Sequence, residues 1–301
     1  MDLEFKKIMI FLSTDEHPSP FDIQMMYDSG ADHVIYYGNV DSKKAKQLIM
    51  DSMFPRGPEG VVHTGMFIGG TNVDECLAIA DVAKKTMFPP FQIATIVDPQ
   101  GGYTTAAALV AKVEHCLKDK FGLDISNATV AVVGGAGRVG GNASFLLAKD
   151  GAKVRIVDIL LDLARKKKEE IDKAVEGAKV EVFGEEPRSP EVLERALKGA
   201  DVIITTGPPG LQLVPKSILE KLPDCKVAAD VNAVPPLGIE GLKSSKDCKV
   251  FLGNIHGIGA LAIGPLKNQI EMTLIKRAIN EPSGFFELEE MHKVAKSLLN
   301  L

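Results

Sequence analysis

Short apolar runs alternate with amphipathic stretches along almost the whole chain. In the first third, apolar runs predict strands at residues 8–12, 34–37, 61–68 and 92–97, and amphipathic stretches predict helices at residues 21–30 and 74–86. Such alternation is typical of βα units that build a mostly parallel sheet. An alanine-rich helix is expected over residues 103–117, where it carries the chain into a second domain.

The alternation becomes more regular after residue 128. Strands are predicted at residues 128–133, 153–157, 180–183, 202–205, 226–229 and 250–252, and helices at residues 142–150, 160–175, 190–198 and 216–221. These elements predict a sheet of about six strands. The tail, residues 270–301, is helical by its apolar spacing except for a break at residues 282–284.

A glycine-rich turn lies between the first strand and the first helix of this second half. Gly135, Gly137 and Gly140 form the spacing GxGxxG, and Asp158 ends the next predicted strand. Strand, glycine turn, helix, strand and acid in that order are typical of a Rossmann dinucleotide site. In that interpretation Gly135 permits the tight turn, Gly137 lets the backbone approach the pyrophosphate, and Gly140 lets helix and strand pack closely.

The fold class that follows is α/β, with two α/β domains and a cleft between them. We expect residues 1–105 plus 266–301 to form a substrate-binding, catalytic domain. Residues 106–265 are expected to form a Rossmann-type doubly wound parallel sheet that binds NAD or NADP.

Composition excludes several other functions. With 45% hydrophobic and 25% charged residues the chain has an ordinary globular mixture, and no run of 18 apolar residues is present to cross a bilayer. The net charge of −5, with both signs interspersed, argues against a nucleic-acid surface. The apolar stretch at residues 8–12 is too short for a signal peptide, so we expect a cytoplasmic protein without membrane contact.

Cysteines and histidines give no sign of a metal site. The four cysteines, Cys76, Cys116, Cys225 and Cys248, lack CxxC spacing, and a chain of this length does not need covalent cross-links. We therefore expect buried or inert thiols and no disulfide. The six histidines are scattered without ligand spacing, so no metal is expected, and only His17 is kept as a candidate site residue.

Several strings outside the glycine turn combine Gly, Pro, Asn and Asp just after predicted strands. They are PSPFD at 18–22, YGNV at 37–40, FIGG at 67–70, DPQGGYTTAAA at 98–108, TGPPG at 206–210, DVNAVPPLG at 230–238 and GIGALAIGPLK at 257–267. Together they resemble the NAD(P)-dependent methylene-tetrahydromethanopterin dehydrogenases of one-carbon metabolism, over nearly the whole chain. Packing alone does not explain such strings, and carboxyl ends of strands are where open α/β sheets place ligands.

The resemblance implies hydride transfer from the methylene group of a reduced pterin to the nicotinamide, leaving a methenyl cation. No proton moves in that step, so positioning and charge stabilisation suffice, and the lack of a Ser-His-Asp set does not argue against catalysis. A homo-oligomer is also implied, and the apolar face of the helical tail is consistent with one.

The resemblance also implies a set of site residues. The catalytic candidates are Asp22, which can bond the guanidine-like edge of the pterin or stabilise the cation, and Lys267, which can grip the pterin carbonyl. The substrate-binding candidates are Pro20, Phe21, Thr104, Thr105 and His17. The cofactor-binding candidates are Gly135, Ala136, Gly137, Arg138, Val139, Gly140, Asp158, Thr206, Gly207 and Asn232.

Bland alternatives exist for most of them. Asp22 can be a first-turn carboxylate that stabilises its helix, Lys267 an exposed helix lysine, and Thr104 or Thr105 a helix N-cap.

Asp158 favours NAD over NADP, because its carboxylate can accept hydrogen bonds from the ribose hydroxyls and repels a 2′-phosphate. Arg138 and the basic run at residues 165–168 are the cations that can offset this preference.

Three other functions remain open from the sequence. Tetrahydrofolate carries the same reactive ring as tetrahydromethanopterin, so methylene-tetrahydrofolate is a second substrate candidate. A shikimate-dehydrogenase-like carbonyl reductase is another, and it needs a proton-donating Lys-Asp pair. A dinucleotide-sensing Rossmann protein is the non-enzymatic alternative, but it has no need of the polar strings in the first domain.

Overall fold

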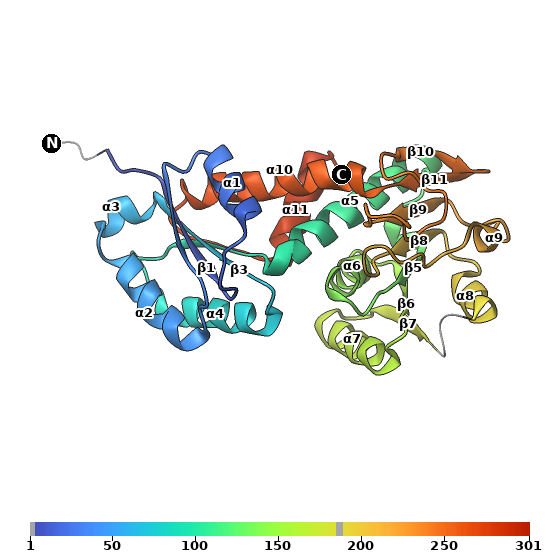
Figure 1. Cartoon of the computed structure of the whole chain (residues 1–301), viewed down its shortest axis with the longest axis horizontal. Coiled ribbons are helices and arrows are strands. Elements are labelled where there is room, and N and C mark those ends of the chain that lie inside the picture. The colour runs from blue at the N-terminus through green and yellow to red at the C-terminus, as the bar shows by residue number, and fades with distance from the viewer. Residues whose placement is uncertain (1–3, 185–188) are drawn as a thin grey trace. The chain divides into compact units, whose positions relative to one another are not determined.

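The computed structural model describes residues 4–184 and 189–301, and the chain divides into two compact units, each built on its own sheet (Figure 1). Unit 1 comprises Met1–Thr104 and Asn268–Val294, and unit 2 comprises Thr105–Lys267 and Ala295–Leu301. None of the helices in the described part of the chain combines the length and apolar character that a bilayer crossing requires.

Unit 1 contains a five-stranded parallel sheet in the order β12-β4-β3-β1-β2. Its strands are β1 (Ile8–Ser13), β2 (His33–Tyr37), β3 (Thr64–Gly69), β4 (Ala94–Val97) and β12 (Phe285–Phe286). All residues of β3 and β4 are buried, as expected for inner strands of a parallel sheet with covered faces. The edge strand β2, by contrast, is largely exposed.

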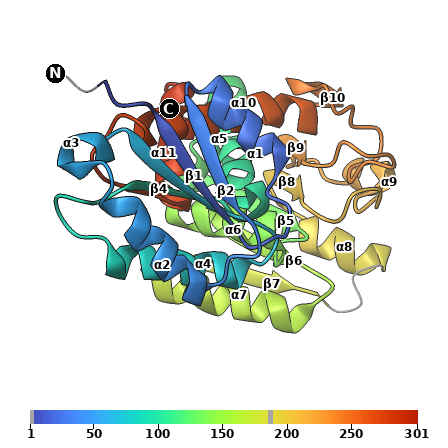
Figure 2. The same ribbon diagram turned by 60° about the vertical axis from the view of Figure 1, so that its left-hand side comes forward.

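The helices of unit 1 include α1 (Pro20–Asp28), α2 (Ser42–Met53), α3 (Gly57–Val61) and α4 (Val73–Thr86). Figure 2 shows α2 and α4 side by side along the sheet, and their buried residues share one core with it. Ile49 of α2 and Ile79 of α4 meet Leu12 of β1 in that core. β1 and β3 pair in parallel, and their carboxyl ends carry the loops described below.

Unit 2 contains a seven-stranded sheet in the order β10-β11-β9-β8-β5-β6-β7. The strands are β5 (Thr129–Val133), β6 (Lys153–Val157), β7 (Lys179–Phe183), β8 (Val202–Thr205), β9 (Val227–Asp230), β10 (Asp247–Leu252) and β11 (Ile255–Ile258). All neighbours are parallel except the hairpin β10–β11. The chain runs outward from β5 through β6 to β7 and returns with β8 on the other side of β5, so β5 marks a topological switch point.

The helices of unit 2 include α6 (Arg138–Lys149), α7 (Leu161–Ala174), α8 (Pro190–Leu197) and α9 (Lys216–Leu219). The long helices α5 (Gly102–Phe121), α10 (Ala260–Ala278) and α11 (Leu288–Leu298) contain the points at which the chain passes from one unit to the other. The final residues, Ala295–Leu301, group with unit 2.

The structure corrects several sequence expectations. Residues 61–63 are not strand: Val61 ends α3, its side chain is buried there, and β3 starts only at Thr64. The helix α2 was not predicted, because its lysines obscure a buried stripe at Ala45, Ile49 and Met53. The second sheet has seven strands rather than about six, because the hairpin strand β11 was not recognised.

The expectation of no disulfide is wrong. Cys116 of α5 and Cys248 of β10 are bonded to each other, although 132 positions separate them in the sequence. Spacing rules detect neighbours along the chain, whereas these two cysteines become neighbours only when α5 and β10 pack. The other two, Cys76 and Cys225, are buried thiols, as expected.

Candidate functional site

The glycine turn connects β5 to the N-terminus of α6. Gly134 has a φ of +83°, in the left-handed region, so the tight turn rests on Gly134 and not on Gly135 as the sequence suggested. Gly135 is required for space, because a Cβ there would lie 2.6 Å from the carbonyl oxygen of Val132. A Cβ on Gly140 would collide with the Gly134 carbonyl oxygen and lie 2.5 Å from Oγ1 of Thr206.

Gly137 occupies a different position in the turn. It is exposed at the N-cap of α6, and the nearest atom to a Cβ there would be the Gly134 oxygen, 3.3 Å away. In the described part of the chain no side chain caps this helix end. The first N–H groups of α6 therefore lie at the positive end of the helix dipole, next to the exposed backbone of Gly137. Such an arrangement is suited to binding the pyrophosphate of a dinucleotide.

Asp158 follows β6 and closes the turn from the neighbouring strand. Its Oδ2 accepts a hydrogen bond from the backbone nitrogen of Ala136, 2.9 Å away, and its Oδ1 accepts one from that of Leu160, 3.0 Å away. Each carboxylate oxygen keeps lone-pair capacity for a further donor. The negative charge is thus held beside the glycine turn, where a ribose can reach it.

The loop after β8 lies against the same turn. The hydroxyl of Thr206 donates to the carbonyl oxygen of Gly134, 3.0 Å away, and its backbone nitrogen donates to Val133. A Cβ on Gly207 would lie 2.6 Å from the end of the Leu213 side chain, which would have to shift. Thr206 and Gly207 therefore lie beside the glycine turn at the carboxyl ends of adjacent strands.

A buried carboxylate that sequence reasoning missed organises the next loop. Asp230, at the end of β9, is only 2% exposed and accepts hydrogen bonds from the Thr205 hydroxyl and from the backbone nitrogens of Asn232 and Gly238, at 2.8–3.0 Å. Burial raises the pKa of Asp230 against the effect of these bonds. The Asn232 amide donates to the Pro208 oxygen, 2.8 Å away, and so is used to join the loops after β8 and β9.

In unit 1 the strings of the family resemblance also converge. Each of the four parallel strands β1 to β4 is followed by, or ends within, one of these strings. The strands end at Ser13, Tyr37, Gly69 and Val97, and the corresponding strings lie at residues 18–22, 37–40, 67–70 and 98–108. Parallel strands present their carboxyl ends at one edge of a sheet, so one edge carries all four strings. That edge is the candidate substrate site of unit 1.

Asp15, which sequence reasoning missed, ties these loops together. Its carboxylate accepts hydrogen bonds from the backbone nitrogen and the hydroxyl of Thr71, the latter 2.6 Å away, and its carbonyl oxygen accepts one from Asn39. Asn39 has a left-handed φ of 51°, and Gly38 has no room for a Cβ against the Glu16 carbonyl. The loops after β1, β2 and β3 are therefore one hydrogen-bonded assembly.

The first candidates of unit 1 lie at the start of α1. Asp22 is buried, with an exposed fraction of 9%, and its backbone nitrogen donates to the capping hydroxyl of Ser19. Pro20, Phe21 and His17 are exposed, Phe21 to 44%. The helix start thus presents an aromatic ring and a proline at the surface, with a carboxylate behind them that the positive helix terminus stabilises.

Thr104 is used by the fold itself. It is fully buried at the start of α5, and its hydroxyl donates to Asp98, 2.5 Å away. Asp98 follows β4, is 2% exposed and also accepts a hydrogen bond from the backbone of Tyr103. Thr104 therefore positions this loop together with Asp98, a residue missed from the sequence, while Thr105 is only half-buried.

Lys267 is half-buried within α10. The helix begins at Ala260, not near residue 270, and Pro265 is accommodated inside it. Pro265 is the sixth residue of this helix, past the four N-terminal N–H groups that lack intrahelical partners, so the helix continues through it with one backbone donor missing. Lys267 thus projects from a regular helix.

Fold and glycine turn together define a two-unit α/β protein whose second unit is of the Rossmann type. Two solved structures share this architecture: shikimate 5-dehydrogenase from Listeria monocytogenes, with a TM-score of 0.51 and 14% identity over 89% of this chain and 91% of that one, and quinate dehydrogenase from Corynebacterium glutamicum, with a TM-score of 0.50 and 13% identity over 99% and 100%. At such identities the likeness concerns the fold alone.

Sequence comparison identifies the family. The model of the methylene-tetrahydromethanopterin dehydrogenase N-terminal domain matches residues 20–100, and that of the NmrA-like family matches residues 126–218. The NAD(P)-dependent methylenetetrahydromethanopterin dehydrogenase of Methylorubrum extorquens is 36% identical over 279 residues, 91% of this chain and 92% of that protein. The bifunctional protein MdtA of the same organism is 33% identical, over 97% and 99%.

The chain belongs to the methylene-tetrahydromethanopterin dehydrogenase family. This confirms the resemblance inferred from the strings after the strands.

Proposed function

We propose that this protein oxidises the methylene group of methylene-tetrahydromethanopterin to the methenyl form and delivers the hydride to NAD(P)+. The observation that carries the proposal is the 36% identity, over 91% of the chain, to a relative named for that reaction. The shikimate-type reductase is less well supported, because the likeness to such enzymes is confined to fold. A dinucleotide sensor would not require the assembled polar loops of unit 1.

The chemistry fits what the residues offer. The methylene carbon lies between two nitrogens whose lone pairs expel the hydride, and the bound nicotinamide supplies the carbon that accepts it. No proton is transferred, so the enzyme's tasks are to place two flat rings face to face and to stabilise positive charge.

Asp22 and Lys267 are assigned complementary roles. The Asp22 carboxylate accepts hydrogen bonds from the guanidine-like edge of the pterin or stabilises the developing cation, and its burial strengthens either interaction. The Lys267 ammonium would oppose that cation, so it binds the pterin carbonyl. Exposed Phe21 and Pro20 supply apolar contact for the flat ring, with Thr105 and His17 at the margin.

The dinucleotide is assigned to the glycine turn. The outward N–H groups at the start of α6 bind the pyrophosphate, with Ala136, Arg138 and Val139 in the turn and first helical residues. Asp158 binds the adenosine ribose and favours NAD, while Thr206, Gly207 and Asn232 line the nicotinamide half. The side-chain hydrogen bonds of Thr206 and Asn232 hold the loops that contain them in place.

The deciding experiment is a parallel assay with methylene-tetrahydromethanopterin and methylene-tetrahydrofolate. Formation of NADH or NADPH is followed by absorbance, and shikimate with NADP serves as the control for the carbonyl-reductase alternative. We expect the higher kcat/KM with the methanopterin substrate. A higher value with the folate would assign the same chemistry to the other pterin, and activity with shikimate alone would refute the proposal.

The protein is further proposed to be a homo-oligomer. Support comes from the edge strand β2, where Ile35, Tyr36 and Tyr37 are 44%, 56% and 41% exposed. Edge strands are normally protected by charge or proline, and HVIYY has neither, so a second copy is the natural cover. Light scattering at micromolar concentration tests this, and a monomer would contradict it.

A further inference from the structure

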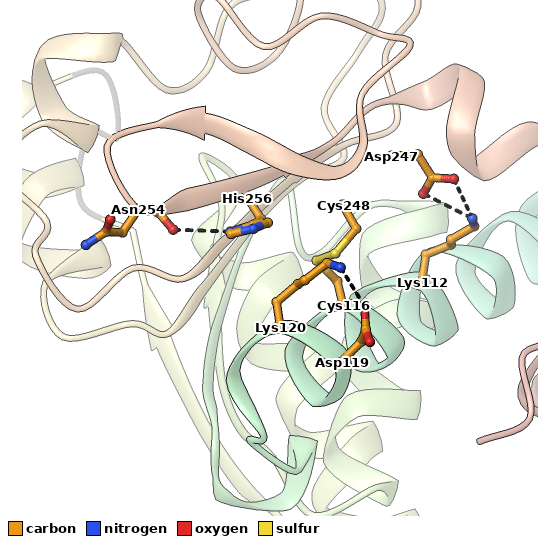
Figure 3. The surroundings of a disulfide bond; sticks show 8 residues. All are labelled: Lys112, Cys116, Asp119, Lys120, Asp247, Cys248, Asn254 and His256. Atoms are coloured by element: carbon orange, nitrogen blue, oxygen red, sulfur yellow. Dashed lines mark hydrogen bonds and ion pairs between the residues drawn. A yellow bond between two sulfur atoms is a disulfide. The ribbon is translucent and has the colours of Figure 1, made fainter.

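The disulfide between Cys116 and Cys248 joins a helix to the outermost strand of the unit 2 sheet (Figure 3). The two Cα atoms are 5.6 Å apart, within the range that a disulfide spans without moving the backbone. The 132-residue separation encloses β5 to β9 and the glycine turn. One covalent bond therefore closes almost the entire dinucleotide-binding unit into a loop.

The backbone at Cys248 is shaped to make this bond. The pairing of β10 with β11 shifts register between Asp247 and Lys249, so Cys248 is the extra residue of a bulge. Its φ is +49°, a left-handed conformation that residues with a side chain disfavour unless their surroundings impose it. A bulge turns its unpaired residue out of the ladder, and here the side chain points to α5.

Noncovalent contacts run alongside the disulfide. Lys112 lies one helical turn before Cys116 and pairs with Asp247, with Nζ 3.0 Å from Oδ2. Phe121, farther along α5, meets the ring of His256 on β11 edge-on, with centroids 5.1 Å apart. The hairpin β10–β11 is thus fastened to α5 at three successive points, of which only the middle one is covalent. This matters because β10 is an edge strand with a single neighbour.

We propose that Cys116 and Cys248 are a native redox modification site, oxidised in the folded protein, which clamps the β10–β11 hairpin onto α5. Oxidation proceeds by exchange with a small disulfide such as oxidised glutathione. One cysteine thiolate attacks it and releases one glutathione thiol. The second cysteine then displaces the other, so that two protein thiols become one disulfide and two glutathione thiols form.

Access to the sulfurs favours persistence of the bond. Cys116 is fully buried, whereas Cys248 is half-buried, so a reducing thiolate must attack the sulfur of Cys248 and leave the Cys116 thiolate in an apolar interior. Burial disfavours that charged leaving group, so reduction of the folded protein is slow. The bond therefore acts as a structural clamp and not as a rapidly cycling switch.

The first test counts thiols in the full-length protein, incubated with oxidised glutathione and then denatured. Two thiols should react with Ellman's reagent, those of Cys76 and Cys225, and four after reduction. Peptide mapping should recover the linked pair. Four reactive thiols without reduction would overturn the proposal, as would a disulfide that maps to any other pair.

The second test measures what the clamp does. Reduction with a phosphine should lower the Tm of the wild type by about 5–15 °C, since the loop is long, and should leave the double variant Cys116→Ala, Cys248→Ala unaffected. Cys248→Asn should retain a higher Tm than Cys116→Ala. Asparagine tolerates the left-handed φ at position 248, whereas Cys116→Ala leaves Cys248 in that disfavoured conformation without the disulfide. An equal Tm for oxidised and reduced wild type would overturn the clamp.

Hydrogen exchange supplies a local readout that does not depend on any variant. Reduction should accelerate exchange of the amides of β10 and β11, and leave those of the inner strands β5 and β8 unchanged under native conditions. Unchanged exchange in β10 and β11 on complete reduction would contradict the role assigned to the disulfide.

Discussion

The carboxylate of Asp158 accepts a hydrogen bond from the backbone nitrogen of Ala136 across 2.9 Å, so the end of β6 holds the glycine turn that follows β5. A residue expected from the sequence to choose the cofactor is thus also part of the turn that binds it. The second oxygen accepts a hydrogen bond from Leu160, which fixes the orientation of the carboxylate. Charge and hydrogen bonding at this position can be separated by two substitutions.

Asp158 should set a preference for NAD. Two unit charges about 4 Å apart interact by about 4 kcal/mol at an effective dielectric near 20, and screening leaves roughly 1–3 kcal/mol, a preference of roughly 5- to 150-fold. Asp158→Ser should shift kcat/KM toward NADP. Asp158→Asn should shift it similarly with a smaller loss of stability, because its amide oxygen can still accept from Ala136. A wild type that prefers NADP tenfold would contradict this assignment.

Alanine substitutions at two glycines of the turn should affect different properties, stability in one case and dinucleotide binding in the other. Gly140→Ala places a Cβ against the Gly134 carbonyl and Thr206, so it should destabilise the unit by about 1–3 kcal/mol and lower the Tm by about 5 °C. Gly137→Ala meets only an oxygen 3.3 Å away, so the Tm should change little while the KM for the dinucleotide rises. Calorimetry and cofactor titration distinguish the two. Equal effects on both quantities would argue against separate roles.

Lys267→Ala should lower kcat/KM for the pterin by roughly 10- to 150-fold, because the substitution removes one charged hydrogen bond to the substrate. The affinity for the dinucleotide, measured by fluorescence titration, should stay within about twofold of the wild type, because that ligand is assigned to the glycine turn and to the loops after β8 and β9, which lie far from Lys267 in the sequence. Lys276→Ala, on the exposed side of the same helix, is the matched control and should leave both quantities unchanged. Wild-type activity of Lys267→Ala would remove Lys267 from the site.

Thr104→Val should destabilise unit 1 without directly removing a substrate contact. The change leaves the buried Asp98 carboxylate without its hydroxyl donor, at a cost of about 1–3 kcal/mol or a Tm lower by about 5 °C. Thr104→Ser keeps the hydroxyl and should largely restore the Tm. Thr105→Val, at a half-buried position, should lower substrate affinity with less effect on the Tm. The opposite pattern would place Thr104 at the ligand.

Stability should fall at alkaline pH for an identifiable reason. Burial raises the pKa of the Cys76 thiol from 9.0 to about 11, so the folded state holds its proton more tightly than the unfolded state does. That contribution is fully present below pH 9 and is lost as the pH rises through about 11. The Tm measured across this window should decline, and less steeply in Cys76→Ser. An identical decline in both proteins would exclude Cys76 as a cause.

The family, the glycine turn and most strands could be predicted from local pattern. A largely apolar run flanked by turn residues leaves little alternative to an inner strand, as at β5 and β8. A string such as DPQGGYTTAAA indicates the family without any knowledge of its position in the fold. Predictions were poorer where lysines masked a buried stripe, as in α2, or where a helix begins with Gly and Pro residues, as α10 does ten residues before the predicted start at residue 270.

The sequence by itself therefore determined the class of fold, the family and the candidate ligand-binding strings, because these depend on residue types and their order. Tertiary structure alone decided which polar residues meet. It placed Asp15 against Thr71, Asp230 against Thr205, and Cys116 against Cys248. Hydrogen bonds and disulfides act only over a few ångströms, and distances of that size between residues far apart in the chain are set by the packing of whole elements.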